Sequence, residues 1–414
     1  MNKLYGCIGE RLTHSFSKEI HNALGDYDYR IIELEREALG DFARQGSFAA
    51  INVTIPYKEA IIPYLYGIDE HAASIGAVNT VVNRDGKLYG YNTDFFGMSE
   101  LFDHAGVSVK GKKVLILGTG GTSKTAYAVA AARGAREILR VSRTAREGAI
   151  TYTEMYARHT DAEVVINTTP VGMHPNIFDK AIELERFPCL SGVIDAVYNP
   201  LRTPIILDAK KRGIPAEGGL YMLVAQAVRA SEIFTDTKYG YGELERVYRK
   251  IMSDKENIVL IGMPGCGKST VGSLVSQMLG RELVDTDRLI EKKAGKDIPT
   301  IFREDGEAVF RKLEAELIRE CASKNGVVIA TGGGSVLLAD SLDALRENGR
   351  IYFIDRPLER LVPTNDRPLS STSEDITRRY EERYGIYTSV ADVAVNADCS
   401  PNTVAEKTIK EFMK

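Results

Sequence analysis

Residues 113–142 read KVLILGTGGTSKTAYAVAAARGAREILRVS. An apolar run is followed by a glycine-rich turn, an alanine-rich segment and a second run with β-branched residues. This order is typical of two parallel strands joined by a helix. Similar short β-branched runs alternate with amphipathic segments along the rest of the chain, so the sequence predicts an α/β fold with parallel sheets.

The 414 residues are too many for one ordinary core and predict several domains. A mixed α/β segment, 1–105, precedes a Rossmann-type lobe expected over 106–250, with a cleft between them and a final helical region that returns to the first lobe. A new strand, NIVLIG, begins at Asn257 after the charged segment ELERVYRKIMSDKE. This restart predicts a short helical joint near 250–256 and a further domain over 256–414.

The composition is that of a globular protein, with 44% apolar and 27% charged residues. A net charge of −4 offers no general attraction for nucleic acid, so we expect small molecules as partners. The five cysteines are scattered and never spaced as CxxC, which predicts reduced thiols. No apolar run has the length of a signal peptide or a membrane span, and we therefore expect a cytoplasmic protein with no membrane partner.

The strongest local motif is Gly262-Met-Pro-Gly265-Cys-Gly267-Lys268-Ser269-Thr270, between the apolar run IVLI and the segment STVGSLVSQML. It matches GxxxxGK[ST] in the strand–loop–helix context of a phosphate-binding loop. Glycines let successive backbone N–H groups face phosphates, and the helix N-terminus adds partial positive charge. The motif predicts an ATP site in which Lys268 reaches the β- and γ-phosphates and Ser269 ligates Mg²⁺.

Carboxylates and glycines follow the next expected strands of this domain. The run ELVDTD ends in Asp285 and Asp287, which places both at the carboxyl edge of the sheet. One suits the metal, for which we favour Asp285, and the other suits an acceptor hydroxyl; alternatively, both only cap a helix that begins at Arg288. The triple glycine at 332–334 predicts that backbone approaches a ligand closely.

The ordered motifs GMPGCGKST, DTD, FRKLE, TGGGS and RPL, the last at 367–369, make residues 257–414 similar to the shikimate kinase family. The resemblance implies a P-loop domain with a parallel sheet that phosphorylates shikimate with ATP. It implies that Asp287 holds and helps to deprotonate the acceptor hydroxyl, while Arg311 and Arg383 bind the carboxylate. It also assigns ring contacts to Gly333 and Gly334, adenine stacking to Arg360 and a lid role to Arg367, although LVPTND between these arginines departs from the usual basic lid.

The glycines of the opening stretch lie between a buried strand and a helix, as a pyrophosphate-binding turn requires. They are Gly118, Gly120 and Gly121. The second strand of this unit ends at Ser142, Arg143 and Thr144, with no acidic residue to accept from a ribose 2′-OH. Because Arg143 can pair with a 2′-phosphate, the sequence favours NADP(H) over NAD(H).

A candidate proton-transfer pair lies upstream, where Lys58 ends INVTIPYK and Asp94 ends YNTD. A lysine and a carboxylate that meet in a cleft can exchange a proton with a substrate, because the carboxylate orients the ammonium group and adjusts its pKa. Spacing leaves open whether they meet. A solvated helical lysine and an N-capping aspartate fit the same positions.

Nine ordered motifs make residues 1–250 similar to the shikimate dehydrogenase family: THSFSKEIHN, INVTIPYKEA, GAVNT, YNTDFFG, GTGGTSK, SRT, NTTPVGM, DAVYNP and GGLYMLVAQA. The resemblance implies that NADPH reduces the C3 ketone of 3-dehydroshikimate while Lys58 donates the proton and Asp94 orients it. It assigns the substrate to Ser15, Ser17, Thr54, Asn79 and Gln226, and the cofactor and its surroundings to Thr169, Tyr198 and Gly219. Tyr221 stands where many members of the family have glycine.

Taken together, the motifs favour a bifunctional enzyme of aromatic amino acid biosynthesis over two alternatives. A ligand sensor could keep both folds without catalysis, but it has little reason to retain Lys58, Asp94, Lys268 and Asp287 together. A relative could act on quinate with NAD in the first half, or on another small alcohol in the second. The two serines at 15 and 17, with Arg143, favour shikimate and NADP.

Overall fold

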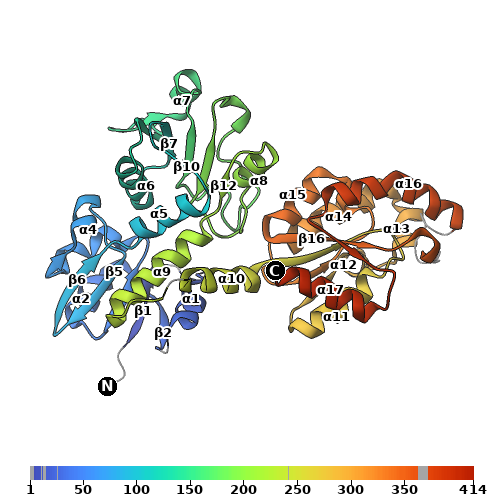
Figure 1. The fold of residues 1–414 in the computed structure, drawn as a ribbon, viewed down its shortest axis with the longest axis horizontal. Coiled ribbons are helices and arrows are strands. Elements are labelled where there is room, and N and C mark those ends of the chain that lie inside the picture. Colours follow the sequence, from blue (N-terminus) through green and yellow to red (C-terminus); the bar gives the residue numbers. More distant parts are fainter. Residues whose placement is uncertain (1–3, 11, 13–14, 26, 241, 362–371) are drawn as a thin grey trace. The chain divides into compact units, whose positions relative to one another are not determined.

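The chain forms two compact units, Met1–Ile251 and Met252–Lys414. The computed structural model describes residues 4–10, 12, 15–25, 27–240, 242–361 and 372–414. The division falls inside α10 (Glu243–Lys255), a continuous helix. Each unit contains its own sheets and apolar cores (Figure 1), and each is therefore described by itself.

The first lobe of the N-terminal unit is a six-stranded sheet with the order β2-β1-β3-β5-β6-β4. It is mixed, unlike the parallel sheets that the sequence pattern predicts, because β5 and β6 form an antiparallel hairpin. The turn residues Asp85 and Gly86 have φ values of 52° and 82°, the left-handed conformation that an Asp-Gly turn favours. The elements are β1 Tyr5–Gly9, α1 Ser17–Leu24, β2 Tyr29–Glu33, α2 Leu39–Gln45, β3 Ala50–Val53, α3 Tyr57–Ala60, β4 Gly67–Ile68, α4 Glu70–Ile75, β5 Thr80–Arg84 and β6 Lys87–Tyr91.

The second lobe is a parallel six-stranded sheet with the order β12-β11-β10-β7-β8-β9. Strand order reverses at β7, so loops after β7 and β10 leave the sheet side by side, which is where α/β sheets bind nucleotides. Apolar clusters cover both faces of this sheet. Its elements are β7 Lys113–Leu117, α6 Gly121–Ala132, β8 Glu137–Ser142, β9 Ile150–Thr151, α7 Tyr152–Arg158, β10 Val164–Asn167, β11 Gly192–Asp195, α8 Pro204–Lys211 and β12 Ala216–Glu217.

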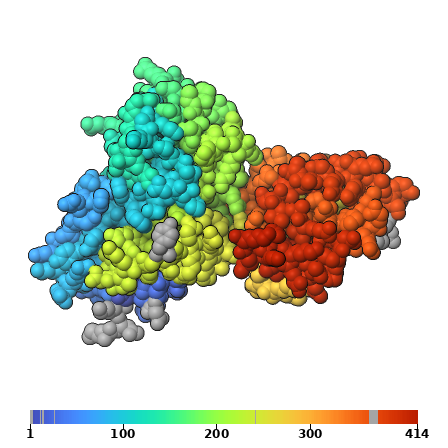
Figure 2. Space-filling model, viewed as in Figure 1, coloured from blue at the N-terminus to red at the C-terminus, as the bar shows by residue number. Residues whose placement is uncertain are grey.

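Two long helices connect these lobes. Helix α5 (Asp94–His104) leads from the first sheet to the second, and Figures 1 and 2 show it in cyan between the blue first lobe and the green second lobe. Helix α9 (Leu220–Thr235) follows β12 and packs Ala230 and Phe234 against Tyr29 of the first lobe. The chain therefore crosses between the lobes once in each direction.

The C-terminal unit is a parallel five-stranded sheet with the order β14-β15-β13-β16-β17. A large apolar cluster surrounds its central strands, and a smaller one lies among α12, α13 and α14. The elements are β13 Asn257–Ile261, α11 Lys268–Leu279, β14 Leu283–Asp285, α12 Thr286–Ala294, α13 Ile298–Glu304, α14 Gly306–Ala322, β15 Val328–Ala330, α15 Ala339–Asn348, β16 Gly349–Asp355, α16 Ser373–Val390, β17 Val393–Asn396 and α17 Pro401–Phe412. Among the helices of the described ranges, none is long and apolar enough to cross a membrane.

Candidate active sites

Lys58 and Asp94 meet where the two lobes of the first unit join. Lys58 lies in α3, just after β3, and Asp94 is the first residue of α5. The Nζ of Lys58 donates a hydrogen bond to Oδ2 of Asp94 over 2.5 Å, and the side chains are 17% and 9% exposed. The charge-assisted bond fixes the direction of the ammonium group. The sequence left this pairing open, and the structure shows the two groups in contact.

An amide network continues from this pair. The side-chain oxygen of Asn79 accepts from the backbone N–H of Thr93 over 2.7 Å, and its Nδ2 donates to Thr93 Oγ1 over 3.0 Å. The same Nδ2 lies 3.4 Å from Oε1 of Gln226, which comes from α9. Because Thr93 directly precedes Asp94, this network joins three elements behind the Lys58–Asp94 pair.

The other predicted substrate residues line the first sheet. Thr54 follows β3, and its N–H donates to the carbonyl of Ile8 over 3.0 Å. The hydroxyls of Ser15 and Ser17 lie 3.0 Å apart at the start of α1. In the described part of the chain, neither serine hydrogen-bonds to the Lys58–Asp94 pair, so the structure brings the predicted substrate residues together only in part.

The glycine turn of the second lobe approaches the lysine. Gly118 has a φ of 112°, and a Cβ there would lie 2.8 Å from Thr168 Oγ1. Gly120 caps α6, and a Cβ on Gly121 would lie 4.0 Å from Cδ of Lys58. The backbone N–H groups at the start of α6 therefore lie beside Lys58. This position suits the phosphate of a dinucleotide.

The residues predicted to determine the preference for NADP(H) over NAD(H) lie at the end of β8. The N–H of Thr144 lies 3.4 Å from the buried Ser142 Oγ, and Arg143 is exposed. A residue that we did not single out from the sequence, Arg146, donates from Nη1 to Oγ1 of Thr119 in the glycine turn over 3.1 Å. Its signal was a second basic residue in the same loop, two positions beyond Thr144.

A buried carboxyl group organises the loop after β10. Asp195 accepts from Asn167 Nδ2 over 2.9 Å and from Thr203 Oγ1 over 2.5 Å, and burial raises its pKa to about 7 against these hydrogen bonds. Asn167 in turn accepts from Thr169 Oγ1 over 2.7 Å. Asp195 is the first residue of the motif DAVYNP, which predicted no role for it, and through Asn167 it holds Thr169 in place.

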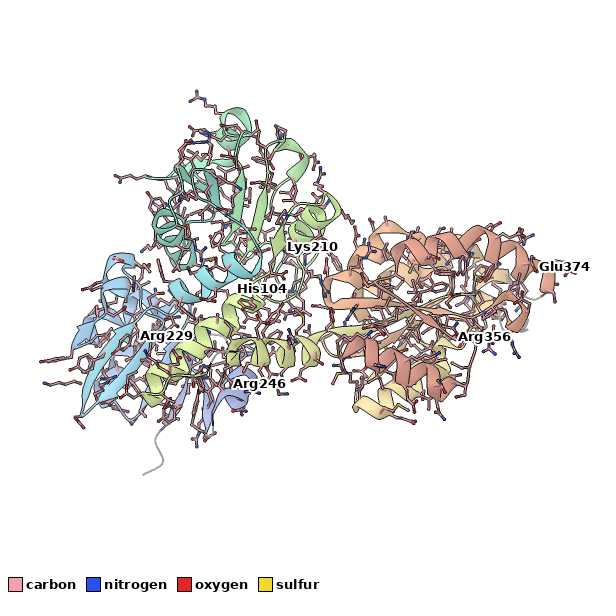
Figure 3. The ribbon with its side chains drawn as sticks, viewed as in Figure 1. His104, Lys210, Arg229, Arg246, Arg356 and Glu374 are labelled. Atoms are coloured by element: carbon pink, nitrogen blue, oxygen red, sulfur yellow. The ribbon has the colours of Figure 1, made fainter. Side chains whose placement is uncertain are left out.

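Three further residues of the second-lobe motifs make different kinds of contact: Tyr198, Gly219 and Tyr221. The ring of Tyr198 lies 5.2 Å from that of Phe16 in the first lobe. A Cβ on Gly219 would overlap the carbonyl of Ala196, so only glycine fits there. The buried Tyr221 hydroxyl donates to Glu245 of α10 over 2.7 Å and its ring stacks on His104, labelled in Figure 3. Tyr221 therefore anchors α10.

The phosphate loop of the second unit has the conformation that its glycines allow. Gly262, Gly265 and Gly267 have φ values of 146°, 81° and 99°. A Cβ on Gly262 would lie 2.9 Å from the carbonyl of Ile354. Lys268 is buried at the start of α11, and its Nζ donates to the carbonyls of Gly262 and Met263 over 2.8 and 3.0 Å. Ser269 and Thr270 follow in the first turn of α11.

The two aspartates of DTD occupy different positions. Asp285 ends β14, and its carboxylate accepts from the N–H of Arg288, so it caps α12. The helix begins at Thr286, two residues earlier than the start we considered, because Asp285 supplies the cap. Asp287 turns toward the triple glycine, since a Cβ on Gly332 would lie 2.6 Å from its Oδ1. Helix capping therefore explains the position of Asp285 but not that of Asp287.

The triple glycine is the meeting point of the second site. A Cβ on Gly333 would lie 3.0 Å from the ring of Pro264 in the phosphate loop, and one on Gly334 would lie 2.3 Å from Nη1 of Arg311. The carbonyl of Gly333 accepts from Arg383 Nη1 over 3.3 Å. Three segments far apart in sequence therefore converge on backbone that carries no side chain.

Arg311 is held by acidic neighbours. Its guanidinium pairs with Glu314 over 2.7 Å and with Glu307 over 3.1 Å. Glu314 is buried and also accepts from Ser335 Oγ over 2.8 Å. We did not assign a role to Glu314 from the sequence, where it stands only as the last letter of FRKLE.

The predicted nucleotide-side arginines are less well placed. Arg360 is exposed and pairs with Asp398 over 3.3 Å. Arg367 lies outside the described residues. Arg356, labelled in Figure 3 and missed from the sequence, follows β16, and its Nη1 lies 3.9 Å from where a Cβ on Gly267 would be. Its position next to the phosphate loop follows from the pairing of β16 with β13, which the sequence does not show.

The two sites define a dinucleotide-type oxidoreductase unit and a P-loop phosphotransferase unit in one chain. Comparison with known proteins agrees with both. Two family models match: the shikimate dehydrogenase substrate binding domain over residues 7–81, and shikimate kinase over residues 264–413. The NADP(+) shikimate dehydrogenase of Clostridium perfringens is 35% identical over 268 residues, which cover 60% of this chain and 98% of that protein. That of Geobacillus kaustophilus is 38% identical over 57% of this chain and 93% of the relative.

Solved structures give the same result for the first unit. Shikimate dehydrogenase 1 from Peptoclostridium difficile superposes with a TM-score of 0.56 at 34% identity, covering 60% of this chain and 97% of that one. A chorismate mutase/shikimate 5-dehydrogenase fusion from Clostridium acetobutylicum gives 0.57 at 30% identity, covering 61% and 97%. The chain belongs to the shikimate dehydrogenase family and also carries a shikimate kinase domain, which makes it a bifunctional enzyme of the shikimate pathway.

Proposed function

We propose that the first unit reduces 3-dehydroshikimate to shikimate with NADPH and that the second phosphorylates shikimate to shikimate 3-phosphate with ATP and Mg²⁺. The observation that carries the first activity is the 2.5 Å contact of Lys58 with Asp94 beside the glycine turn. The observation that carries the second is the convergence of Asp287, Arg311 and Arg383 on the triple glycine next to the phosphate loop.

In the reduction, Lys58 donates a proton to the oxygen of the ketone as negative charge develops there. Asp94 keeps the ammonium group directed at that oxygen and accepts a hydrogen bond from a substrate hydroxyl. A bound NADPH supplies the hydride. We assign the substrate's remaining polar groups to Ser15, Ser17, Thr54, Asn79 and Gln226, of which Asn79 and Gln226 already share one hydrogen-bond network.

The residues of the second lobe fit a dinucleotide. The turn at Gly118, Gly120 and Gly121 offers backbone N–H groups at a helix start, where a side chain on Gly118 would meet Thr168. Arg143 and Arg146 offer guanidinium groups for a 2′-phosphate. We place Ser142 and Thr144 on the same phosphate side and Thr169, Tyr198 and Gly219 around the nicotinamide half.

In the phosphorylation, Asp287 accepts the proton of the shikimate hydroxyl, and Arg311 and Arg383 bind its carboxylate. Lys268 neutralises charge on the transferred phosphoryl group. Ser269 and Asp285 offer the oxygen ligands that Mg²⁺ prefers. We assign the phosphates to the loop from Gly262 to Thr270. We keep Arg360 and Arg367 as nucleotide-side residues.

A coupled assay tests the proposal. The full-length protein receives 3-dehydroshikimate, NADPH, ATP and Mg²⁺, and products are separated by chromatography. We expect NADPH consumption without ATP, and shikimate 3-phosphate only when ATP is added. Quinate with NAD⁺ serves as the matched control substrate pair, and faster turnover of that pair than of shikimate with NADP⁺ would overturn the assignment of the first unit. Absence of both products would favour the ligand sensor.

A further inference from the structure

The N-terminal half of α16 carries a buried arginine, Arg379, for which the sequence motifs predict no role. Arg379 is 9% exposed, as is Arg383 one turn further along the same helix. Its Nε makes no hydrogen bond, and within the described residues its guanidinium forms no ion pair. The adjacent Arg378 is the opposite case, because it is 62% exposed on its side chain and pairs with Asp375 over 2.7 Å.

The charges around Arg379 do not balance. Burial lowers its pKa, and the positive charges of Arg383 and Arg378 lower it further, which outweighs the opposite effect of Asp375 and Glu382. Arg311, the third guanidinium of the site, is already paired with Glu314 and Glu307. Arg383 donates to a neutral carbonyl, that of Gly333. Within the described residues, neither of these two neighbouring buried cations on α16 forms an ion pair with a carboxylate, an arrangement that costs folding free energy and that an anionic ligand would relieve.

The position along α16 indicates which end of the site Arg379 serves. Tyr387, one turn after Arg383, donates a hydrogen bond to the Gly333 carbonyl and belongs to the same apolar cluster as Cys266 of the phosphate loop. Arg379 lies one turn before Arg383, about 6 Å further along the helix axis from that loop. It thus lies on the side of Arg383 that is away from the phosphate loop.

We propose that Arg379 is a further substrate-binding residue of the kinase unit, which holds the carboxylate of the acceptor together with Arg383. This inference rests on the proposed function, because it takes Arg383 as a carboxylate ligand. Arg379 and Arg383 then form a pair of donors on one helix face, and the carboxylate supplies the charge that the buried pair needs.

The test is kinase kinetics on full-length R379M, with R378M as the matched control and R379K as the charge-conserving variant. We expect R379M to raise the KM for shikimate about tenfold, the effect of one charge-assisted contact, and to leave the KM for ATP within twofold. R379K should lie between wild type and R379M, and R378M should match wild type. With the neutral carboxamide of shikimate as acceptor, wild type and R379M should not differ.

Thermal unfolding separates binding from structure. A buried, unpaired arginine replaced by an apolar side chain of similar length should leave Tm unchanged or raise it, whereas loss of a structural arginine lowers it. An unchanged KM for shikimate in R379M, or an equal loss with acid and carboxamide, would overturn this inference alone. A wild-type chain that phosphorylated no shikimate would overturn the proposed function and this inference with it.

Discussion

At the scale of single residues, the contact of Lys58 with Asp94 gives the most direct prediction. Lys58→Ala deletes the proton donor, and we expect kcat for ketone reduction to fall by about 10² to 10⁴, the usual contribution of general acid catalysis. Asp94→Asn keeps the shape but not the charge and should lower kcat by a smaller factor. NADPH oxidation with saturating 3-dehydroshikimate measures both. Lys87→Ala, which changes an exposed lysine of β6, should match wild type.

The arginines after β8 predict cofactor choice. Arg143→Glu and Arg146→Glu should each raise the KM for NADPH at least tenfold, because a carboxylate would face the 2′-phosphate. The KM for NADH should change less than threefold, since a ribose 2′-OH carries no charge. Initial rates with the two cofactors give the comparison. Equal effects on both cofactors would contradict the assignment of this loop.

The different positions of the two aspartates predict different defects. Asp287→Asn should lower kcat for shikimate phosphorylation by about 10² or more and leave the KM for ATP nearly unchanged, because this carboxylate faces the acceptor side. Asp285→Asn should instead raise the Mg²⁺ concentration needed for half-maximal rate. Kinase rates measured against ATP concentration and against Mg²⁺ concentration in both variants separate the acceptor role of Asp287 from the metal role of Asp285. Near-normal kcat in Asp287→Asn would remove Asp287 from the mechanism.

How much of each site the sequence predicts depends on the kind of evidence. Lys58, Asp94, Lys268 and Asp287 stand inside ordered motifs, so their positions could be predicted, although only the fold shows that Lys58 meets Asp94. Arg146, Arg356 and Arg379 stand outside such motifs, and Glu314 stands inside FRKLE without a predicted role. Their importance lies in what surrounds them, namely burial and the presence or lack of a counter-charge, which a linear sequence does not display.

At the scale of elements, the alternation of apolar runs predicts the parallel sheets. The hairpin of β5 and β6 can be predicted only from the sequence of its turn. The dipeptide Asp85-Gly86, between the short runs TVVNR and KLYGY, is a hairpin signal that the general alternation of apolar runs does not reveal. Tyr221 shows the opposite case. Its position in the motif GGLYMLVAQA is evident from the sequence, but only helix packing shows that its hydroxyl donates to Glu245 of α10.

Helix α15 carries an element-scale prediction about stability and pH. Burial, reinforced by Asp343, raises the pKa of Glu347 to about 9, and its Oε2 makes no hydrogen bond. Because the folded pKa lies above the unfolded value, the folded state is favoured by the protonated form, and stability falls as pH rises from about 4.5 toward about 9.

Glu347→Gln should remove this dependence. We expect the variant to be more stable than wild type at pH 8, by about 5 kcal/mol, and nearly equal at pH 4.5. Urea unfolding of the second unit, followed at both pH values, gives the comparison. A variant that is less stable at pH 8 would show that Glu347 is charged and paired in the folded protein.

At the scale of the whole molecule, each unit contains its own phosphate-binding loop, reactive residues and core, so the two activities should be separable. Lys58→Ala should abolish reduction and leave phosphorylation of added shikimate close to wild type. Lys268→Ala should do the reverse. The measurement is kcat/KM for both reactions in both variants. A folded variant that lost both activities would require a shared or strongly coupled site.

Division of the chain gives a second test at this scale. The first half of α10 packs Leu244 and Tyr248 into a core of the first unit, whereas the carbonyls of Ser253 and Glu256 accept from Arg281 in the second. A cut between Ile251 and Met252 therefore leaves each group of contacts with its own unit. We expect both fragments to be soluble and active, with kcat/KM values close to those of the intact chain.

The strand orders described above also bear on descent. In the second lobe, the strand after the glycine turn, β8, pairs directly with β7; in the C-terminal unit, β14 is separated from β13 by the inserted β15. Substitutions cannot exchange these orders, because the chain would have to be threaded through the sheet again. The different strand orders therefore argue against a duplication within this chain, and the glycines that the two loops share serve one common way of binding phosphate.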